Sequence, residues 1–459
     1  MLLRDTIAAI STPPGTGAIG IVRISGPASE EILKSLFRPE KKTEYFESHR
    51  LYYGDIVSPQ TGAVLDEVLV SLMRSPHSYT GEDVVEIHCH GGPVILQAVL
   101  AESIRAGARP ARPGEFTERA FLNNRMDLSQ AEAVMDMIMA GTEMSLGLAI
   151  SHLKGVLSRK IKNLRDAVID LLALVEASID FPEEDIDIPR EELETGIKEI
   201  AGRIRELLST YEEGRIYREG LNVVITGRAN VGKSSLLNRL LGEERAIVTP
   251  IPGTTRDFIA EAINIKGIPV RLTDTAGIRR PEDFIEREGI KRVWERLSTA
   301  DIVLMVFDGS EPLTPDDADI IEGNRGRKIV PVINKTDLPA GISDQSIRER
   351  FPGTEPVRIS AKYGDGISEL KDRIHGCFAQ QSENRAVQEA MISNLRHKTA
   401  LEKAQFILSR AEESIAAGFS LEFIAADLRD VWGVLGEIIG ETAGEDVLER
   451  IFSTFCIGK

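Results

Sequence analysis

Residues 227–234 place the strongest constraint on how this chain can fold. Their order, Gly-Arg-Ala-Asn-Val-Gly-Lys-Ser, fits the pattern G-x-x-x-x-G-K-S/T. That pattern binds phosphate when it lies between a strand and the helix that follows it. The apolar run 221–225 before it predicts a buried strand, and residues 235–241 after it predict a helix. The sequence therefore predicts an α/β domain with a phosphate-binding loop at the edge of its sheet.

The residue types in this loop suit the phosphates of a nucleotide. Gly227 and Gly232 let the backbone bend so that successive N–H groups point at phosphate oxygens. Lys233 can reach the β- and γ-phosphates, and the Ser234 hydroxyl can ligate Mg²⁺. We therefore expect nucleotide contacts from Gly227, Asn230, Val231, Gly232, Lys233, Ser234 and Ser235.

Two further motifs follow in the order that a guanine-nucleotide switch requires. The loop 252–257 contains Thr254 and Thr255, where a hydroxyl, expected from Thr255, can complete the Mg²⁺ shell. A hairpin with strands at about 259–265 and 269–273 then leads to the Asp-Thr-Ala-Gly motif. In that motif Asp274 would hold Mg²⁺ through water and the Gly277 N–H would sense the γ-phosphate. Nucleotide contacts are expected from Thr249, Thr254, Thr255, Asp274, Thr275, Ala276 and Gly277.

The choice of base follows from two motifs near the end of the same region. Strands at 302–307 and 329–333 precede Asn-Lys-Thr-Asp, in which Asp337 can accept both the N1–H and the exocyclic amine of guanine. Adenine lacks that pair of donors and would leave the carboxylate unpaired. A backbone N–H of Ser-Ala-Lys after the next strand can reach the guanine carbonyl. Base contacts are expected from Asn334, Lys335, Asp337, Ser360, Ala361 and Lys362. The five motifs together predict a GTP-binding domain with a doubly wound sheet.

The expected catalytic groups differ from those of Ras-like proteins. Ile278 stands where those proteins carry a glutamine that orients water, and isoleucine cannot hydrogen-bond water. Asn230 offers a neutral oxygen near the bridge between the β- and γ-phosphates, which suits a monovalent cation. Such a cation can do the charge work of an arginine finger.

Composition narrows the class of protein. A length of 459 residues predicts about three domains, and 42% hydrophobic with 28% charged residues is typical of a soluble globular protein. No apolar run reaches membrane-spanning length and no signal-peptide pattern is present, so we expect a cytoplasmic protein without membrane contact. A net charge of −17 argues against a broad basic face for nucleic acid, while leaving room for a local basic patch or a partner that supplies one.

The N-terminal region predicts an α+β domain. Strands are expected at 6–10, 19–24 and 83–90, with a helix from Pro93 to about Ala106. A formal G-x-G-x-x-G at 15–20 runs into a strand and so predicts a hairpin connection instead of a dinucleotide site. His88 and His90 share one face of a strand while Cys89 points away, which argues against a metal site. Cys89, Cys377 and Cys456 fit no disulfide or metal framework.

Helical periodicity covers most of the remaining sequence. It runs from about Ser129 to Tyr217, broken by the acidic loop 180–187, and resumes after about Ser382. The strand-rich unit thus interrupts a helical one, as inserted domains commonly do. We predict a multidomain α+β chain with an N-terminal α+β domain and a discontinuous helical domain that carries an inserted Ras-like α/β P-loop GTPase domain. The expected domains are residues 1–118, 119–219 with 379–459, and 220–378.

The ends of the sequence closely resemble those of the MnmE/TrmE tRNA-modification GTPases. The resemblance covers essentially the whole chain, and the two ends are more diagnostic than the GTPase motifs, which many families share. It rests on residues 5–15, 20–26, 79–83 and 111–121 and on the terminal Phe-Cys-Ile-Gly-Lys at 455–459, beside the GTPase set above.

This resemblance implies a reaction and its partners. The N-terminal domain would bind a tetrahydrofolate derivative, 5-formyl- or 5,10-methylene-tetrahydrofolate, and form a constitutive homodimer. An FAD- and NADH-using partner of the MnmG type would join it, as a heterotetramer, to install aminomethyl or carboxymethylaminomethyl groups at carbon 5 of the wobble uridine of certain tRNAs. The folate would supply the one-carbon unit.

The resemblance also implies residue roles. Folate contacts would come from Arg23, Glu82, Arg125 and Lys459. Arg125 and Lys459 suit the carboxylates of a glutamate tail and Glu82 suits the donor edge of a pteridine, although Arg125 stands where some relatives have lysine. Cys456 lies in the tail that the family places near folate and substrate, and its role stays open.

For the GTPase, the resemblance implies activation by K⁺ through dimerisation of the nucleotide-binding domains. K⁺ would be held by Asn230, Thr249, Ile251 and Thr254. Glu286 stands at the family's position for a carboxylate that orients the attacking water indirectly. With Lys233 and Asn230 it completes the expected catalytic set.

Three alternative functions agree less well with the sequence. A ribosome-assembly GTPase would share the asparagine-bearing loop, but such proteins usually carry a KH-type RNA module or tandem GTPase domains, and neither pattern is present. A scaffold that binds GTP without turnover conflicts with the intact Lys233, Ser234, Thr255 and Asp274. A folate enzyme acting alone would need a redox group, and the sequence has no flavin fingerprint.

Overall fold

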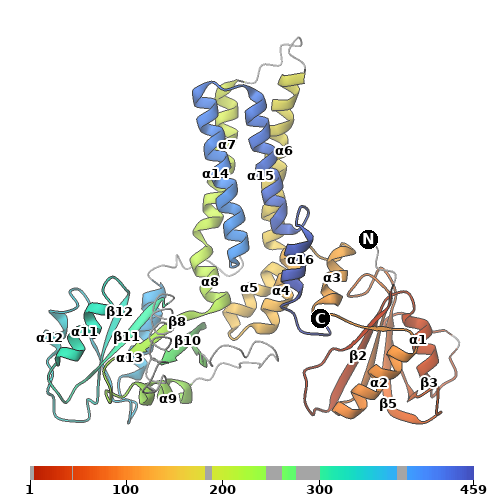
Figure 1. Ribbon diagram of the computed structural model, residues 1–459, viewed down its shortest axis with the longest axis horizontal. Helices are drawn as coiled ribbons and strands as arrows, with labels where there is room; N and C mark the ends of the chain where they lie inside the picture. The colour runs from red at the N-terminus through yellow and green to blue at the C-terminus, as the bar shows by residue number, and fades with distance from the viewer. Residues whose placement is uncertain (1–4, 44, 181–188, 244–260, 275–299, 380–389) are drawn as a thin grey trace, which may run out of the picture. The chain divides into compact units, whose positions relative to one another are not determined.

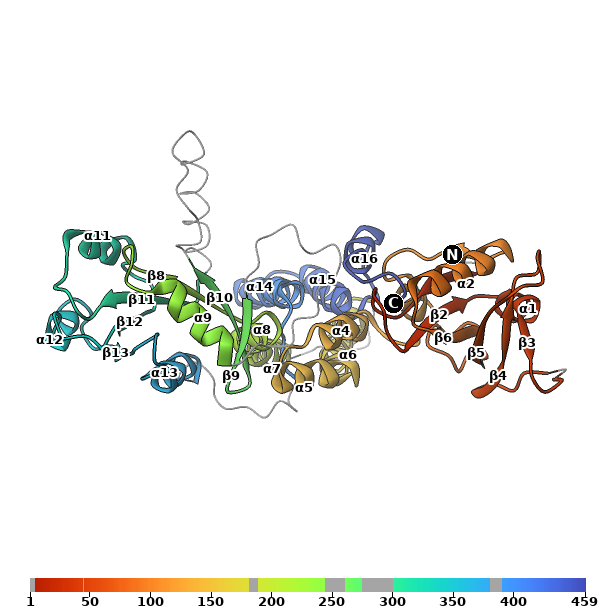
Figure 2. The ribbon, with the colours of Figure 1, turned by 90° about the horizontal axis from the view of Figure 1, so that it is seen from below.

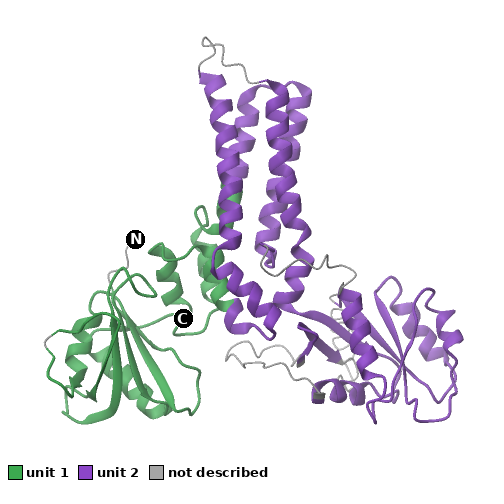
Figure 3. Ribbon diagram, turned by 180° about the vertical axis from the view of Figure 1, so that it is seen from behind, with its two compact units in different colours: residues 1–135, 433–459 green, residues 136–432 purple. Residues whose placement is uncertain are grey.

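The computed structural model describes residues 5–43, 45–180, 189–243, 261–274, 300–379 and 390–459. The chain divides into two compact units, residues 1–135 with 433–459 and residues 136–432 (Figure 3). The mixture of a strand-rich N-terminal region, long helices and an α/β region agrees with the fold class expected from the sequence (Figure 1). The domain boundaries at 118, 219 and 378 stay a prediction.

A seven-stranded sheet forms the first unit's centre, in the order β3-β4-β5-β6-β2-β1-β7. Neighbouring strands pair antiparallel except β1 and β7, which are parallel. The three strands expected from the sequence are confirmed as β1, β2 and β6. The bounds are β1 Ile7–Ile10, β2 Ile19–Ser25, β3 Phe37–Pro39, β4 Arg50–Val57, β5 Val64–Met73, β6 Val84–His90 and β7 Arg109–Pro110.

Helices α1 (Ser29–Leu36) and α2 (Pro93–Arg105) pack against this sheet. α2 begins at the predicted residue because proline is well accommodated in the first turn of a helix. Alternate strand residues point toward the helices, so that Val22, Val70 and Ile87 form part of one buried core. Figure 2 shows the strands and these helices from below.

The segment from residue 111 onward and the C-terminal segment complete the first unit. The helices here are α3 (Glu115–Leu122), the start of α4 (Leu128–Met139), the end of α15 (Leu421–Ile439) and α16 (Glu445–Phe452). The tail after α16 returns to the start of the chain: Ser11 Oγ donates to the Gly458 carbonyl at 3.0 Å and the Phe116 N–H donates to the Lys459 carbonyl at 3.2 Å. Gly458 has φ +95°, and a Cβ there would lie 2.3 Å from the Ile10 carbonyl oxygen. The tail thus requires glycine at this point.

Long helices dominate the second unit, where α6, α7, α14 and α15 run side by side (Figure 1). In α6 the buried residues recur three and four apart, including Leu157, Ile161, Leu164 and Val168, which gives one apolar face along the helix. The predicted helical run is confirmed where it is described, while residues 181–187 of the acidic loop lie outside the described residues. The bounds are α5 Glu143–Leu153, α6 Val156–Asp180, α7 Arg190–Ser209, α8 Tyr211–Glu219 and α14 Leu395–Ala417.

The α/β part of the second unit contains a six-stranded sheet in the order β13-β12-β11-β8-β10-β9. All neighbouring pairs are parallel except the predicted hairpin β9–β10, which is antiparallel and turns at Lys266 and Gly267. The bounds are β8 Leu221–Thr226, α9 Lys233–Glu243, β9 Glu261–Ile265, β10 Ile268–Asp274, β11 Ile302–Asp308, α11 Pro315–Gly323, β12 Ile329–Asn334, α12 Asp344–Arg348, β13 Val357–Arg358 and α13 Ile367–Ala379.

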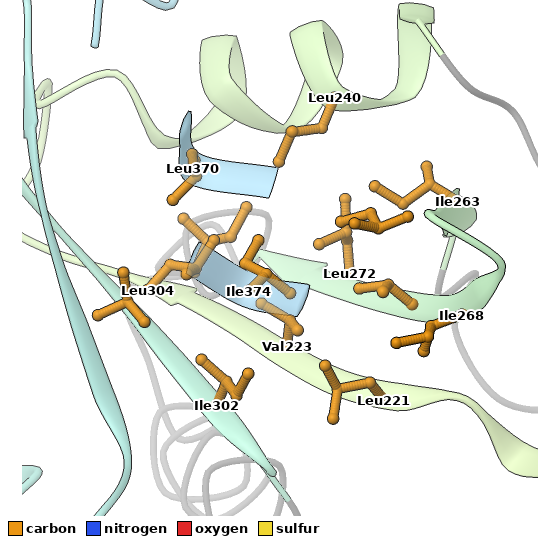
Figure 4. Packing of buried hydrophobic residues seen from close by; sticks show 14 of the residues in the cluster. Leu221, Val223, Leu240, Ile263, Ile268, Leu272, Ile302, Leu304, Leu370 and Ile374 are labelled. Carbon is orange, nitrogen blue, oxygen red and sulfur yellow. The ribbon is translucent and has the colours of Figure 1, made fainter. Parts of the chain in front are cut away.

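Apolar side chains from both layers hold this sheet and its helices together. Leu240 of α9 and Leu370 and Ile374 of α13 belong to the same buried cluster as Leu272 and Leu304 of the strands (Figure 4). The central strand β11 is buried at every position, as expected for a parallel strand covered on both faces. This packing fixes α9, and hence the loop before it, relative to the strand ends.

Candidate functional site

The phosphate-binding loop has the strand–loop–helix setting that its sequence predicts. It leaves β8 at Thr226 and enters α9 at Lys233. Gly227 has φ +146°, and a Cβ there would lie 2.3 Å from the Val306 carbonyl oxygen. Gly232 has φ +97°, and its Cβ would lie 2.2 Å from the Asn334 side-chain nitrogen. Both glycines are therefore required by backbone shape and by space.

The side chain of Lys233 lies over this loop. The residue is 7% exposed, and its Nζ donates to the carbonyl oxygens of Gly227 at 2.7 Å and Arg228 at 2.6 Å. These contacts keep the ammonium at the mouth of the loop, where positive charge stabilises bound phosphate. Val231 is buried beneath the loop, and Ser234 lies in the first turn of α9. Asn230 is exposed on the loop with φ +66°, a conformation that asparagine tolerates better than most residues.

Asn334 joins the phosphate-binding loop to the loop expected to contact the base. Its side-chain nitrogen donates to the Val231 carbonyl at 2.8 Å, and its side-chain oxygen accepts the Ala361 N–H at 3.0 Å. The residue is buried. A single amide thus ties the ends of β12 and β13 to the start of α9.

The remaining base-recognition residues are also held in place. Ser360 Oγ donates to Asp337 Oδ1 at 2.7 Å, which orients the carboxylate expected to bind guanine. Lys335 Nζ contacts Asp308 Oδ2 at 2.5 Å. Burial alone would raise the pKa of Asp308, but hydrogen bonds from Lys335 and Ser310 outweigh it and lower that pKa. The carboxylate at the end of β11 therefore stays ionised and anchors the Lys335 turn.

Strand ends bring the motifs to one edge of the sheet. Asp274 ends β10 in parallel register with Ile225 of β8, next to the phosphate-binding loop. A cavity of about 450 Å³ beside α9 is lined by Ser235, Asn238, Arg239, Gly242 and Ala361. The other expected residues of the nucleotide site, namely Thr249, Ile251, Thr254, Thr255, Thr275, Ala276, Gly277, Ile278 and Glu286, lie outside the described residues.

The four residues of the expected folate site gather near the loop 75–83 and the C-terminal tail. Arg23 on β2 pairs with Glu86 at 2.8 Å and lies over the Tyr79 ring, with 5.4 Å from its guanidinium carbon to the ring centre. It also donates to the Gly458 carbonyl at 3.3 Å. Burial, followed by the nearby charge of Arg23, lowers the pKa of Lys459.

Glu82 and Arg125 complete this group. Ser25 Oγ donates to Glu82 Oε2 at 2.7 Å, and the buried Arg119 donates to both oxygens of Glu82 at 3.2 and 3.1 Å. Arg125 Nε donates to the Ser78 carbonyl at 3.0 Å. The side chains supply one carboxylate and several cations, which are the groups that a pteridine edge and a glutamate tail require.

Two residues in these sites, Arg119 and Arg239, were not predicted from the sequence. Arg119 lies within the 111–121 motif, and its four-residue spacing from Glu115 on a helix was the available signal. Arg239 on α9 contacts the loop after β13, and no motif marks it.

Several histidines and cysteines outside these sites are buried or paired. His90 pairs with Asp66 at 2.7 Å, whereas burial raises the pKa of the Cys89 thiol to about 12. Cys456 is half-buried in the tail, and its carbonyl accepts the Lys459 N–H at 3.3 Å. His397 is buried at the start of α14.

Comparisons with known proteins bear on the whole chain. The family description "MnmE helical domain" matches residues 128–456, and "GTP-binding protein TrmE N-terminus" matches residues 6–125. A protein of Syntrophus aciditrophicus named tRNA modification GTPase MnmE is 53% identical over 458 residues, covering 100% of each chain. The chain belongs to the MnmE family of tRNA modification GTPases.

Other relatives in this family are similar over the same span. The Natranaerobius thermophilus protein named tRNA modification GTPase MnmE is 48% identical over 463 residues, again covering 100% of both chains. Among solved structures, a variant of Era from Aquifex aeolicus bound to GDP·AlF4⁻ is 29% identical over 40% of this chain and 67% of that chain, with a TM-score of 0.29. Among the described residues of this MnmE-family chain, no helix has the length and apolar character needed to cross a membrane.

Proposed function

We propose that this chain hydrolyses GTP and, with a flavoprotein partner of the MnmG type, adds a carboxymethylaminomethyl or aminomethyl group to carbon 5 of the wobble uridine of certain tRNAs. A tetrahydrofolate derivative supplies the one-carbon unit. The observation that carries this proposal is 53% identity, over the full length of both chains, to a protein named tRNA modification GTPase MnmE. The ordered geometry of the nucleotide site and the cluster around Arg23 and Glu82 support it.

In the nucleotide site, residues of the described strand ends would bind the base and the phosphates. Asp337, held by Ser360, accepts the two guanine donors. Lys233 neutralises charge on the β- and γ-phosphates, and Ser234, with Thr255, ligates Mg²⁺. Glu286 orients the attacking water indirectly. We propose the same nucleotide contacts for the other residues of this site that the sequence predicts.

We assign the monovalent cation to Asn230 with Thr249, Ile251 and Thr254. The assignment is supported by the exposed position of Asn230 on the phosphate-binding loop, where its φ is +66°. The bound K⁺ supplies positive charge that a Ras-like protein takes from an arginine finger. Dimerisation of two nucleotide-binding domains would complete this arrangement.

GTP turnover should therefore be at least about fivefold faster in KCl than in NaCl at matched ionic strength. Roughly 1 kcal/mol of charge stabilisation in the transition state gives an effect of this size. Phosphate release at saturating GTP measures it. The Asn230→Ala variant should lose the difference between the two salts. Equal rates in both salts would remove the K⁺ assignment and leave GTP binding intact.

In the N-terminal unit, Glu82 would accept the donors of a pteridine edge and Arg125 and Lys459 would hold the glutamate carboxylates. Arg23 fixes the tail that carries Lys459 through the Gly458 carbonyl. Arg119 keeps Glu82 oriented, because both carboxylate oxygens accept from its guanidinium. Cys456 lies in the same tail, and we give it no role.

The sheet of the first unit supports the expected homodimer. Tyr53, Leu69 and His88 are successive cross-strand partners on β4, β5 and β6, on the face opposite the residues buried beneath α1 and α2. Tyr53 is 48% exposed and Leu69 is 43% exposed. A second copy of this chain would cover these apolar side chains.

The deciding experiment is mass spectrometry of tRNA nucleosides from cells with and without this gene. The modified wobble uridines should disappear from the deletion strain and return when the gene is restored. Their persistence in the deletion strain would overturn the folate and tRNA roles. The GTPase assignment would then stand on its own residues, with ribosome assembly as the leading alternative.

We further propose that the protein acts in the cytoplasm. We also propose the domains 1–118, 119–219 with 379–459, and 220–378. The first would bind folate and dimerise, the second would form the helical support and the third would hydrolyse GTP. The match of residues 128–456 to the MnmE helical domain supports a helical domain in this part of the chain.

A further inference from the structure

A short turn after β13 carries the backbone expected to meet the guanine carbonyl. We call residues 360–365 the base loop. It is closed on itself, because the Ser360 N–H donates to the Asp365 carbonyl at 3.0 Å and the Gly364 N–H donates to the Ser360 carbonyl at 2.7 Å. Asn334 fixes one end of it through the Ala361 N–H. These bonds leave the carbonyl oxygens of Ala361 and Lys362, in the middle of the loop, to be held by another residue.

Arg239 of α9 supplies that support. Its Nε donates to the Ala361 carbonyl at 3.2 Å, and its Nη2 donates to the Lys362 carbonyl at 2.5 Å. The side chain also lies beside Gly364, whose Cβ would come 3.7 Å from the guanidinium carbon. Two adjacent carbonyl oxygens thus accept from two different nitrogens of one planar guanidinium, whereas a lysine would have to reach both from a single nitrogen.

Because the peptide is planar, the contact with Arg239 also fixes the direction of the Lys362 N–H. In a trans peptide the carbonyl oxygen and the following N–H point in opposite directions. When Arg239 holds the Ala361 oxygen, the Lys362 N–H must face away from Arg239. That N–H makes no hydrogen bond within the described part of the chain. It is a donor left for a ligand, two residues after Ser360, which holds the carboxylate of Asp337.

We propose that Arg239 is a positioning residue for guanine recognition. It fixes the peptide between Ala361 and Lys362 so that the Lys362 N–H faces the carbonyl oxygen of guanine. This role deepens the GTP-binding function and rests on it. Arg239 itself need not touch the nucleotide, since it acts through the base loop.

The test compares nucleotides that differ at single groups of the base. GDP carries the carbonyl oxygen, 6-thio-GDP replaces it with sulfur, a weaker acceptor, and IDP keeps the oxygen but lacks the amine that faces Asp337. Dissociation constants of all three are measured by calorimetry for the full chain and for Arg239→Ala. Arg239→Ala should weaken GDP and IDP by about tenfold each and 6-thio-GDP by much less.

Two further variants calibrate the result. Arg239→Lys keeps the charge but loses the paired donors, so it should fall between the wild-type chain and Arg239→Ala. Arg325→Ala makes the same chemical change in the same α/β part at a side chain that is 78% exposed and pairs with Glu322. It should leave all three dissociation constants unchanged.

Each outcome decides the proposal. A loss confined to the nucleotides that carry the oxygen supports it. Unchanged GDP affinity in Arg239→Ala, or an equal loss for GDP and 6-thio-GDP, overturns it, because the effect would then be absent or would not pass through the carbonyl. If the wild-type chain bound no guanine nucleotide, the GTP-binding function would fail instead.

Discussion

Replacing Lys233 with alanine should reduce GTP turnover by at least about a hundredfold and should also weaken GDP binding. Turnover falls because the transferred phosphoryl group loses the lysine ammonium that would stabilise its charge. The effect has a second source in this structure. Lys233 Nζ donates to the carbonyl oxygens of Gly227 and Arg228, so its removal also loosens the loop that presents backbone N–H groups to phosphate. Phosphate release and fluorescent-GDP titration measure the two effects separately.

A suitable control is Lys198→Ala on α7. That side chain is 60% exposed and makes a helical pair with Glu194 at 3.3 Å. Such pairs contribute about 0.5 kcal/mol at most, so turnover should not change. If Lys233→Ala retained wild-type turnover, the loop at 227–234 would not be the site of hydrolysis.

The second large effect is expected at Arg119, which is 1% exposed and lies among three carboxylates. Its guanidinium donates to Asp5, Glu82 and Glu115, and Glu115 is fully buried. Removing this buried cation takes the arginine partner from Glu82 and leaves Asp5 and Glu115 with Arg109 alone of the two arginines that pair with both. We expect Arg119→Ala to destabilise the first unit by about 3–5 kcal/mol.

Hydrogen exchange is the appropriate measurement, because a chain of two compact units need not unfold in one step. Protection should fall in α3 and β6 of the variant and remain at the wild-type level in β11. Arg50→Ala provides the control, since Arg50 is 62% exposed and pairs with the exposed Glu47 at 2.9 Å outside the Arg119 network. It should cost about 1 kcal/mol or less. Wild-type protection in Arg119→Ala would contradict the role given to this network.

The same network predicts how stability depends on pH. Burial by itself raises the pKa values of Asp5 and Glu115, but Arg109 and Arg119 outweigh it and lower both. Carboxyl groups with lowered pKa values in the folded chain stabilise it above their ordinary pKa and lose that contribution as the pH falls. The first unit should therefore weaken in acid, and Arg119→Ala should show a smaller change over the same range.

Local pattern was enough to predict the strand–loop–helix setting of the phosphate-binding loop and the strand ends at which further nucleotide contacts are expected. Gly227, Gly232 and Lys233 stand at fixed spacing because the loop must bend and close over phosphate, and Asp274 and Asn334 end strands because parallel strands share an edge. The strands β1, β2 and β6 followed from their alternating apolar residues. In each case the physical constraint acts within a few residues of the motif.

Contacts between residues far apart in the sequence could not be predicted from such local patterns. Arg239 holds carbonyl oxygens 122 and 123 positions away, and a backbone acceptor leaves no mark on the sequence. Ser11 meets Gly458 across 447 positions. Arg119 is one of several charged residues in its motif. Only the folded structure shows that it pairs with three carboxylates.

The contact between Ser11 and Gly458 bears on the order in which a ribosome makes this protein. The strands β1 and β2 emerge early, yet the residues that pack against their ends are translated only after the helices and the nucleotide-binding part. During most of synthesis the first unit is therefore incomplete. A message cut short anywhere between residues 136 and 432 would yield a sheet whose Arg23 has lost the Gly458 carbonyl that it binds in the finished protein.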